Sequence, residues 1–261
     1  AGHVGKPAHH LHHLVEREAV LIRPRQVALE RAIDEARRES GDAVIIKSEA
    51  LEKTRPEILD CVEALLGPDI VLWGSQVFCK PARTGRKIPW HQDGKYWPMR
   101  PLATVSAWIA IDDATPENGN MRYLPGSHRD GRVLAHRHNA DPGLVLPEEV
   151  VPEAIDESLA RDDSLRAGEF SLHDVYLIHG SEANRSDHRR AGFVVRYMPA
   201  SSVFERGAAD NVMQSAQGAV RVDYATRPIW LLRGTDAFGR NDFRVGHDGS
   251  YRGGRRLSDD L

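Results

Sequence analysis

The spacing of apolar residues changes near residue 68, and this change limits the fold more than any other feature of the sequence. Before it, apolar residues recur every three or four positions, which is typical of amphipathic helices. After it, residues 103–111 alternate with a period of two. Since side chains at i and i+2 share one face of a strand, the second pattern predicts strands. We therefore expect a helical N-terminal part followed by a β-rich core.

Two helices are predicted in the N-terminal part. Residues 25–39 have the pattern of an amphipathic helix. A second helix is predicted after Thr54, because Thr54 and Glu57 have the spacing of a capping box. Gly67 and Pro68 provide its stop signal. The apolar stripe of this second helix consists of Ile58, Leu59, Val62, Leu65 and Leu66.

The core is predicted to contain short strands separated by turn signals such as Asn118-Gly119. The predicted strands are residues 70–80, 103–111, 120–124, 170–179 and 190–198. Residues 126–166 are predicted to be a long loop with one helix near 152–160. Short strands after a helical segment favour a β sandwich or barrel with flanking helices. We expect a single domain over residues 1–261, mostly helical over 1–66 and with its β core over 70–198.

The composition argues against several classes of partner. The 261 residues carry a formal net charge of −3. Without a basic excess, neither nucleic acid nor an anionic membrane surface is an expected partner. No apolar run reaches the roughly 18 residues that a membrane span needs. The two cysteines predict reduced thiols, so we expect a cytoplasmic location.

The segment Trp90-His91-Gln92-Asp93 is the main candidate for chemistry. In an extended segment, His91 and Asp93 share one face and can bind the same metal ion. A third ligand is expected from His179, which follows Asp93 by 86 residues, a separation that suits a rolled sheet. Two histidines and one carboxylate form the facial triad of non-haem Fe(II) oxygenases. That geometry leaves three positions, two for 2-oxoglutarate and one for O₂.

Other histidines have less support as ligands. His128 and Asp130 have the same spacing as the first pair, but their segment is rich in turn residues, so a structural loop role is favoured. His173 lies six residues before His179 on the same predicted strand, about 20 Å away if that strand is straight. We therefore expect His173 to be an interior histidine with satisfied hydrogen bonds.

Several arginines are candidate anion-binding groups. Arg190 opens the last predicted strand and could hold the far carboxylate of 2-oxoglutarate through two parallel hydrogen bonds. The alternative is a solvated charge within the charged run of residues 187–190. Arg100, Arg122 and Arg196 could contact an anionic substrate, or could lie exposed as most arginines do.

Several segments, in this order along the chain, together resemble the phytanoyl-CoA dioxygenase family. They are residues 90–97, 107–112, 117–119 and 125–128, then 179–181 with Asn184, Ser186 and Arg190. Each motif alone is common, but the ordered set is specific. The matches cover about residues 56–198, and the N-terminal part matches poorly.

The resemblance implies a double-stranded β-helix (jelly roll, cupin-like) and a dioxygenase that uses Fe(II), 2-oxoglutarate and O₂. The expected reaction hydroxylates an unactivated C–H bond of a small polar metabolite or natural-product intermediate and releases succinate and CO₂. By position, His91, Asp93 and His179 are implied as iron ligands. The implied cosubstrate-binding residues are Gln76, Trp108, Ser181 and Arg190, and the substrate-pocket residues are Phe78, Tyr96 and Trp97.

Two other functions stay open. A cupin-like metalloenzyme that does not use 2-oxoglutarate would keep the three ligands but give Arg190 no role. A catalytically silent jelly-roll binding module would need none of the three ligands. The sequence does not name the small-molecule substrate or the oligomeric state.

Overall fold

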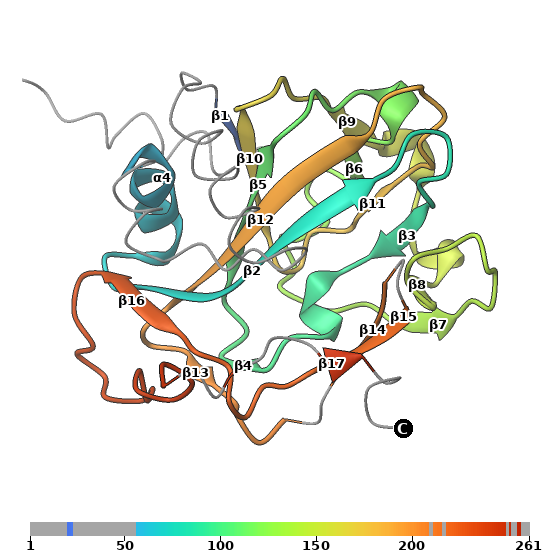
Figure 1. The fold of residues 1–261 in the computed structure, drawn as a ribbon. Coiled ribbons are helices and arrows are strands. Elements are labelled where there is room, and N and C mark those ends of the chain that lie inside the picture. Colours follow the sequence, from blue (N-terminus) through green and yellow to red (C-terminus); the bar gives the residue numbers. More distant parts are fainter. Residues whose placement is uncertain are drawn as a thin grey trace, which may run out of the picture.

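Strands predominate in the part of the chain that the computed structural model describes, which is residues 20–22, 56–208, 211–215, 218–248, 251 and 255–256 (Figure 1). Within these ranges one α-helix is found, α4 (Pro56–Leu66). Four single 3-10 turns accompany it: η1 (Asp93–Lys95), η2 (Pro116–Asn118), η3 (Pro152–Ala154) and η4 (Glu157–Leu159). None of the described helices has both the length and the apolar character needed to cross a membrane.

The larger sheet has six strands in the order β1-β10-β5-β12-β2-β16. Each neighbouring pair is antiparallel, and the long strands β12 and β2 run side by side across the molecule in Figure 1. The bounds are β1 (Val20–Ile22), β10 (Phe170–Asp174), β5 (Val105–Ala110), β12 (Arg190–Pro199), β2 (Ile70–Lys80) and β16 (Trp230–Arg233).

A second antiparallel sheet has the order β3-β11-β6-β9. Its strands are β3 (Ile88–His91), β11 (His179–Ser181), β6 (Met121–Tyr123) and β9 (Arg161–Asp163). The two sheets face each other, because the ring of His173 on β10 lies 4.8 Å from the ring of His179 on β11. Two antiparallel sheets face to face form the jelly roll that was expected.

Three smaller sheets complete the fold. They are formed by β13 (Val203–Phe204) with β4 (Met99–Arg100), by β7 (His136–His138) with β8 (Glu148–Val150), and by β14 (Asn211–Ser215), β15 (Gly218–Val222) and β17 (Arg255–Arg256).

The two faces of the larger sheet differ in character, as the period of two predicts. On β5, Val105, Ala107 and Ile109 belong to an apolar cluster that also contains residues of α4. Ser106 and Trp108 lie on the opposite face, which looks towards the second sheet. This apolar cluster therefore lies outside the barrel, and on the inner face polar groups lie beside a smaller apolar cluster that contains Trp108, Ala110 and Val194.

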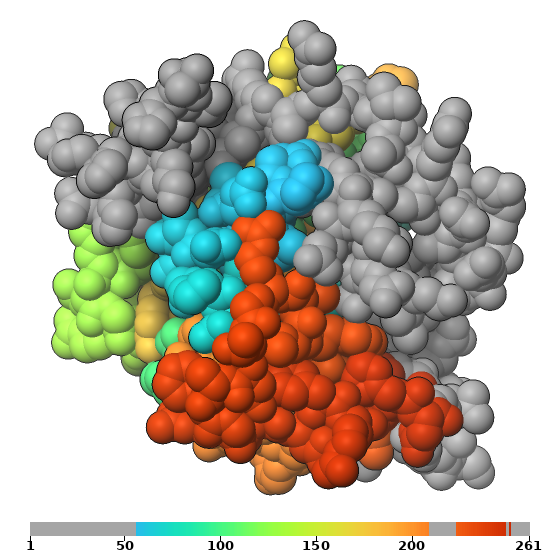
Figure 2. Space-filling model, turned by 90° about the vertical axis from the view of Figure 1, so that its left-hand side faces the viewer, coloured from blue at the N-terminus to red at the C-terminus, as the bar shows by residue number. Residues whose placement is uncertain are grey.

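Helix α4 covers the outer face with the predicted apolar stripe. Ile58, Leu59 and Val62 are fully buried in the same cluster as β5. Arg233 at the end of β16 donates to Asp60 and Glu63 of the helix, at 2.8 Å each. Figure 2 shows this face, with the C-terminal segment (orange to red) lying against the helix (blue).

Most predicted strands are confirmed. β2 has the predicted bounds, and β5, β6 and β12 differ from theirs by one or two residues at an end. The predicted helix at 25–39 and the cap residue Thr54 lie outside the described residues, and the single-domain organisation stays a prediction.

The predicted strand 170–179 is wrong, because it is two strands in different sheets. β10 ends at Asp174, whose carboxylate accepts a hydrogen bond from the backbone N–H of Tyr176 at 2.7 Å. The N–H of Leu177 also donates to the Asp174 carbonyl, at 3.0 Å. A side chain that bonds the backbone two residues on is a turn device of aspartate. The turn sends the chain across to β11 in the second sheet.

The segment 126–166 is more structured than predicted, since it contains β7, β8 and β9. The helix predicted near 152–160 is wrong. Two 3-10 turns are separated there by Ile155 and Asp156 in extended conformation. The Asp156 carboxylate accepts from the N–H of Ser158 at 3.0 Å, which stabilises a local turn in place of a helix.

Gly192 on β12 lets the Trp108 indole lie across the strand, and this generates a stability prediction. A Cβ at residue 192 would lie 2.2 Å from the Trp108 ring. Gly192→Ala should lower the free energy of unfolding in urea by about 1–3 kcal/mol, as overpacking does. Gly207→Ala is the control, because nothing lies within 4 Å of a Cβ there; its effect should stay within about 0.5 kcal/mol. Equal effects would contradict this packing.

Candidate metal centre

His91, Asp93 and His179 come together between the two sheets. Their ligand atoms all lie within 4.8 Å of one another. Nε2 of His91 is 3.6 Å from Oδ1 of Asp93, and the two imidazole rings are 4.3 Å apart. Two nitrogens and one carboxylate oxygen on one side of an ion are the donor set of the facial triad that suits Fe(II). The residues present therefore fit this metal.

Strand register places the two histidines, because β3 and β11 pair with His91 directly opposite His179. Gln92 follows in extended conformation and Asp93 begins the turn η1, so His91 and Asp93 point the same way. The Gln92 side chain is fully buried on the other side. It donates to the carbonyls of Arg132 and Tyr176 at 3.0 and 2.6 Å, which holds the segment in place.

Backbone carbonyls orient both imidazoles. Nδ1 of His91 lies 2.9 Å from the Pro89 carbonyl, and Nδ1 of His179 lies 2.9 Å from the Leu177 carbonyl. Since a carbonyl accepts, the proton sits on Nδ1 of each ring and Nε2 keeps its lone pair. Such hydrogen bonds are the usual way of fixing metal-binding histidines.

The charge states also suit a metal. Burial, followed by the neighbouring His91, lowers the pKa of His179 to about 3, so this imidazole is neutral. Burial opposes ionisation of Asp93, but polar contacts with His173 and His91 outweigh it and hold the carboxyl pKa well below its usual range. Neutral histidines and an ionised carboxylate are the forms that bind metal.

His173 lies beside the cluster, which corrects the expectation that it is too distant. Its Nε2 is 3.7 Å from Oδ2 of Asp93. The expectation assumed one straight strand, whereas the turn after Asp174 folds the chain back. Nor is the side chain satisfied, because Nδ1 is buried with no hydrogen-bond partner among the described residues. The aspartate at 174, a turn former, was the signal that could have revealed this proximity.

Arg190 is buried on the inner face of the larger sheet, 3% exposed. Its Nε and Nη2 donate to the Gly119 carbonyl at 3.0 and 2.6 Å, and its guanidinium lies 5.3 Å from the Trp108 ring. Gly119 has φ 76°, and a Cβ there would lie 2.3 Å from the Glu182 carbonyl oxygen. The solvated alternative for Arg190 is therefore wrong.

Arg189 points the other way and is half exposed. It forms hydrogen bonds with both Asp112 oxygens, at 2.9 and 3.2 Å. Successive residues on a strand face opposite sides, so only one of these two arginines can lie in the barrel.

The other implied cosubstrate residues lie on inner faces of the barrel strands. Ser181 on β11 is buried, and its hydroxyl has no hydrogen-bond partner among the described residues. Gln76 pairs with Val194, which pairs with Trp108, so the three form one row across β2, β12 and β5.

Lys80, which no sequence motif singled out, is a second buried cation at this end of the barrel. It sits opposite Arg190 in the β2–β12 ladder and donates to the carbonyls of Ser181 and Glu182. Burial, followed by the charge of Arg190, lowers the pKa of Lys80 to about 7. The buried guanidinium of Arg190, beside an amine that a nearby anion would keep protonated, makes this end of the barrel favourable for an anion.

The three other candidate arginines differ in their surroundings, and only one of them is buried. Arg100 is exposed and Arg122 lies 3.6 Å from Asp162, whereas Arg196 is buried. Phe78 and Trp97, both expected in the substrate pocket, lie 5.8 and 5.2 Å from the Arg196 guanidinium.

Two other candidates lie apart from this arginine. Tyr96 is partly exposed and follows η1, and its carbonyl accepts from the Tyr224 hydroxyl at 3.2 Å. His128 lies in a turn at 125–130, as expected for a loop histidine.

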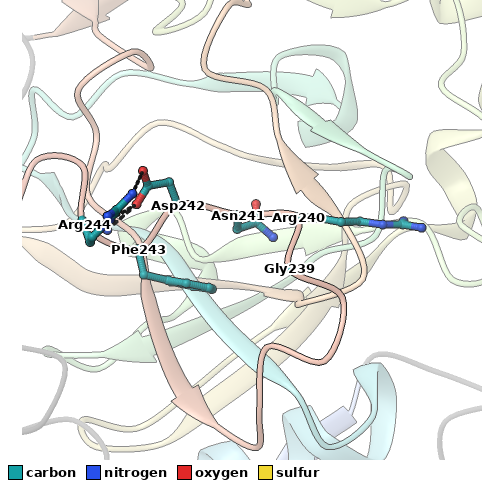
Figure 3. A pocket seen from close by; sticks show the side chains of 6 residues that line it. All are labelled: Gly239, Arg240, Asn241, Asp242, Phe243 and Arg244. Atoms are coloured by element: carbon teal, nitrogen blue, oxygen red, sulfur yellow. Dashed lines mark hydrogen bonds and ion pairs between the residues drawn. The ribbon is translucent and has the colours of Figure 1, made fainter.

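A surface hollow elsewhere contains none of the triad residues. Figure 3 shows it in the loop after β16, lined by residues 239–244. Arg244 donates to both oxygens of Asp242, at 3.1 and 3.2 Å, and lowers the pKa of that carboxyl to about 2. Arg244 and Asp242 neutralise each other and Arg240 donates to the Ser201 carbonyl at 2.9 Å, so the triad remains the candidate centre.

The contact between His173 and Asp93 generates a prediction about metal affinity. Replacing a residue that supports a metal ligand typically costs about 10- to 100-fold in affinity. His173→Phe should weaken Ni²⁺ binding by this factor, measured by calorimetry on purified protein. His138→Phe, at an exposed position on β7, should bind Ni²⁺ like the unchanged protein. An unaltered affinity in His173→Phe would show that the contact does not support Asp93.

Comparison with known proteins agrees with this geometry. The chain is 32% identical over 149 residues to a probable alpha-ketoglutarate-dependent hypophosphite dioxygenase of Stutzerimonas stutzeri, covering 56% of this chain and 51% of that protein. It is 32% identical over 162 residues to an L-proline trans-4-hydroxylase of Streptomyces griseoviridis, covering 54% of this chain and 59% of that protein. The chain thus spans about half the length of these curated relatives.

A solved structure and a family model cover more of the chain. The structure of the non-heme monooxygenase ThoJ in its apo form superposes with a TM-score of 0.64 at 27% identity, covering 87% of this chain and 84% of that one. The family model for phytanoyl-CoA dioxygenase (PhyH) matches residues 12–192, more than half of the chain. The chain therefore belongs to the phytanoyl-CoA dioxygenase family.

Proposed function

We propose that the chain is an Fe(II)- and 2-oxoglutarate-dependent dioxygenase that hydroxylates a C–H bond of a small polar metabolite or natural-product intermediate, with succinate and CO₂ as the other products. The observation that carries the proposal is the buried cluster of His91, Asp93 and His179 facing a sheet that holds the buried Arg190. 2-Oxoglutarate requires a metal ion that it can chelate and a cation that binds its distal carboxylate, and this barrel contains candidate residues for both.

The protein's own residues have distinct tasks. His91, Asp93 and His179 would hold Fe(II) through two neutral nitrogens and one charged oxygen. Bound Fe(II) and 2-oxoglutarate supply the oxidising chemistry. The surrounding buried side chains keep water from the reacting atoms.

Arg190 would bind the distal carboxylate of 2-oxoglutarate. A guanidinium has five N–H donors. The Gly119 carbonyl accepts one bond from Nε and one from Nη2, so the remaining N–H groups can bind a ligand. The Ser181 hydroxyl is a further donor that lacks a partner among the described residues. Trp108 packs against the guanidinium and limits its rotation.

The relatives support this reaction class. Two of them are a probable alpha-ketoglutarate-dependent dioxygenase of hypophosphite and a hydroxylase of L-proline, and both of these substrates are small and polar. A metalloenzyme that does not use 2-oxoglutarate would leave the buried Arg190 without a task, so we rank it second. A cytoplasmic location stays a prediction.

The proposed reaction predicts turnover of the cosubstrate. Purified protein with Fe(II), ascorbate and O₂ should convert 2-oxoglutarate into succinate, slowly in the absence of substrate. His91→Ala removes a metal ligand and should abolish the conversion, which chromatography of succinate measures. Succinate formation that never exceeds this control would exclude the proposed class.

The next prediction compares how Arg189 and Arg190, which are adjacent, affect the requirement for 2-oxoglutarate. Truncating one partner of a buried charge pair costs about 2–5 kcal/mol, which is roughly 30- to 4,000-fold in affinity. Arg190→Ala should raise the 2-oxoglutarate concentration for half-maximal succinate formation by this factor. Arg189→Ala removes a surface pair and should change it by no more than about 2-fold. Similar behaviour of the two variants would contradict the assignment of Arg190.

A further inference from the structure

Arg196 is a buried cation without a carboxylate of its own: the charge of Asp93 acts on it, but the Asp93 oxygens lie against His91 and His173. It lies on the inner face of β12 and is 9% exposed. It forms no ion pair within the described part of the chain, and its Nε has no hydrogen-bond partner there. Buried charges in proteins are normally paired, so an unpaired one calls for an explanation.

Aromatic rings surround the Arg196 guanidinium but do not satisfy it. Its Cζ lies 5.2 Å from the Trp97 ring and 5.8 Å from the rings of Trp73 and Phe78. The ring faces attract a cation, which makes burial tolerable. They do not replace an oxygen acceptor for its N–H groups.

A second arginine converges on the same place. Gly74 on β2 sits directly opposite Arg196, and a Cβ there would lie 3.0 Å from Nη1 of Arg227. The Arg227 guanidinium therefore lies over Gly74, beside Arg196. Its Nε is also buried without a hydrogen-bond partner among the described residues. Burial lowers the pKa of Arg196; the charge of Asp93 opposes this shift, and the charge of Arg227 adds to it.

Strand register locates this arginine pair relative to the metal centre. Arg196 pairs with Ser106, and Ser106 pairs with His173, which contacts Asp93. Two strand spacings separate Arg196 from His173, about 10 Å. The Ser106 hydroxyl between them is buried and has no partner in the described chain.

The cosubstrate anchor is elsewhere. Arg190 lies six residues from Arg196 along β12, about 20 Å in an extended strand. The carboxylate that binds Arg190 therefore cannot also pair with Arg196.

We propose that Arg196 and Arg227, with the Ser106 hydroxyl, bind an oxyanion group of the substrate, either a carboxylate or a phosphorus oxyanion. Trp97 and Phe78 then contact the carbon atoms next to that group. The proposal relies on the proposed function only for the identification of this ligand as the substrate.

Binding of matched probes tests the proposal without turnover. Protein loaded with Ni²⁺ and saturating 2-oxoglutarate, which occupies Arg190, is titrated calorimetrically with benzoate, phenylphosphonate and neutral benzamide. At least one anion should bind about 10-fold or more tightly than benzamide. Tighter binding of benzoate indicates a site for a carboxylate, and tighter binding of phenylphosphonate indicates a site for a phosphorus oxyanion. Equal binding of all three probes, or no binding of either anion, would overturn the proposal.

Variants separate recognition from a structural role. Arg196→Met should abolish the preference for the anion and should raise Tm, because it replaces an unpaired buried charge by an apolar side chain. Arg189→Met, at the exposed neighbour of Arg190, should keep the preference. An Arg196→Met protein that still prefers the anion, or that melts lower than the unchanged protein, would contradict the site.

Arg227→Met provides an independent readout if Arg196→Met does not fold. It should weaken anion binding about 10-fold or more while leaving benzamide unaffected, and unchanged anion binding would also overturn the proposal. Formation of succinate from 2-oxoglutarate is measured separately, so failure of the anion site remains distinguishable from failure of the proposed function.

Discussion

The antiparallel pairing of β3 with β11 is the contact on which the candidate centre depends. Residues that sit directly opposite in such a pair have Cα atoms only about 4.5–5.5 Å apart. This pairing brings together His91 and His179, which are far apart in sequence. A slip of one residue would turn one of the two imidazoles to the other face of the sheet. The candidate metal site therefore relies on strand register, with buried Gln92 holding the segment between His91 and Asp93.

The location of the apolar core explains how the barrel tolerates so many charged groups. The larger sheet buries its main apolar cluster on its outer face, under α4, so its inner face needs only the smaller apolar cluster around Trp108. The inner face can then hold His173, Arg190 and Arg196. Within the described residues, His173 lies near the Asp93 carboxylate, and neither arginine forms a salt bridge. Natural proteins often keep such groups at functional sites at some expense in stability.

Much of this arrangement could be predicted from the sequence, because local periodicity and motif spacing carry it. The alternation along β5 gives the inner and outer faces, and the extended segment at 90–93 puts two ligands on one side. The proximity of His173 was missed because one aspartate side chain, Asp174, breaks the strand.

Arg227 could not have been found from local patterns. Its place beside Arg196 depends on the missing side chain at Gly74, 153 positions earlier in the chain. Long-range juxtapositions of this kind follow from the register of several strands at once.

The left-handed backbone at Gly119 has a consequence for the entropy of anion binding. Its carbonyl holds Arg190 in one rotamer, so the side-chain entropy of that arginine is already lost before a ligand arrives. Preorganisation of this kind lowers the entropic penalty of association. Arg196 has no comparable backbone partner among the described residues, so binding of the proposed ligand must also fix its side chain. The two ends of the barrel therefore differ in the side-chain entropy that an anion must overcome, which is smaller at Arg190 than at Arg196.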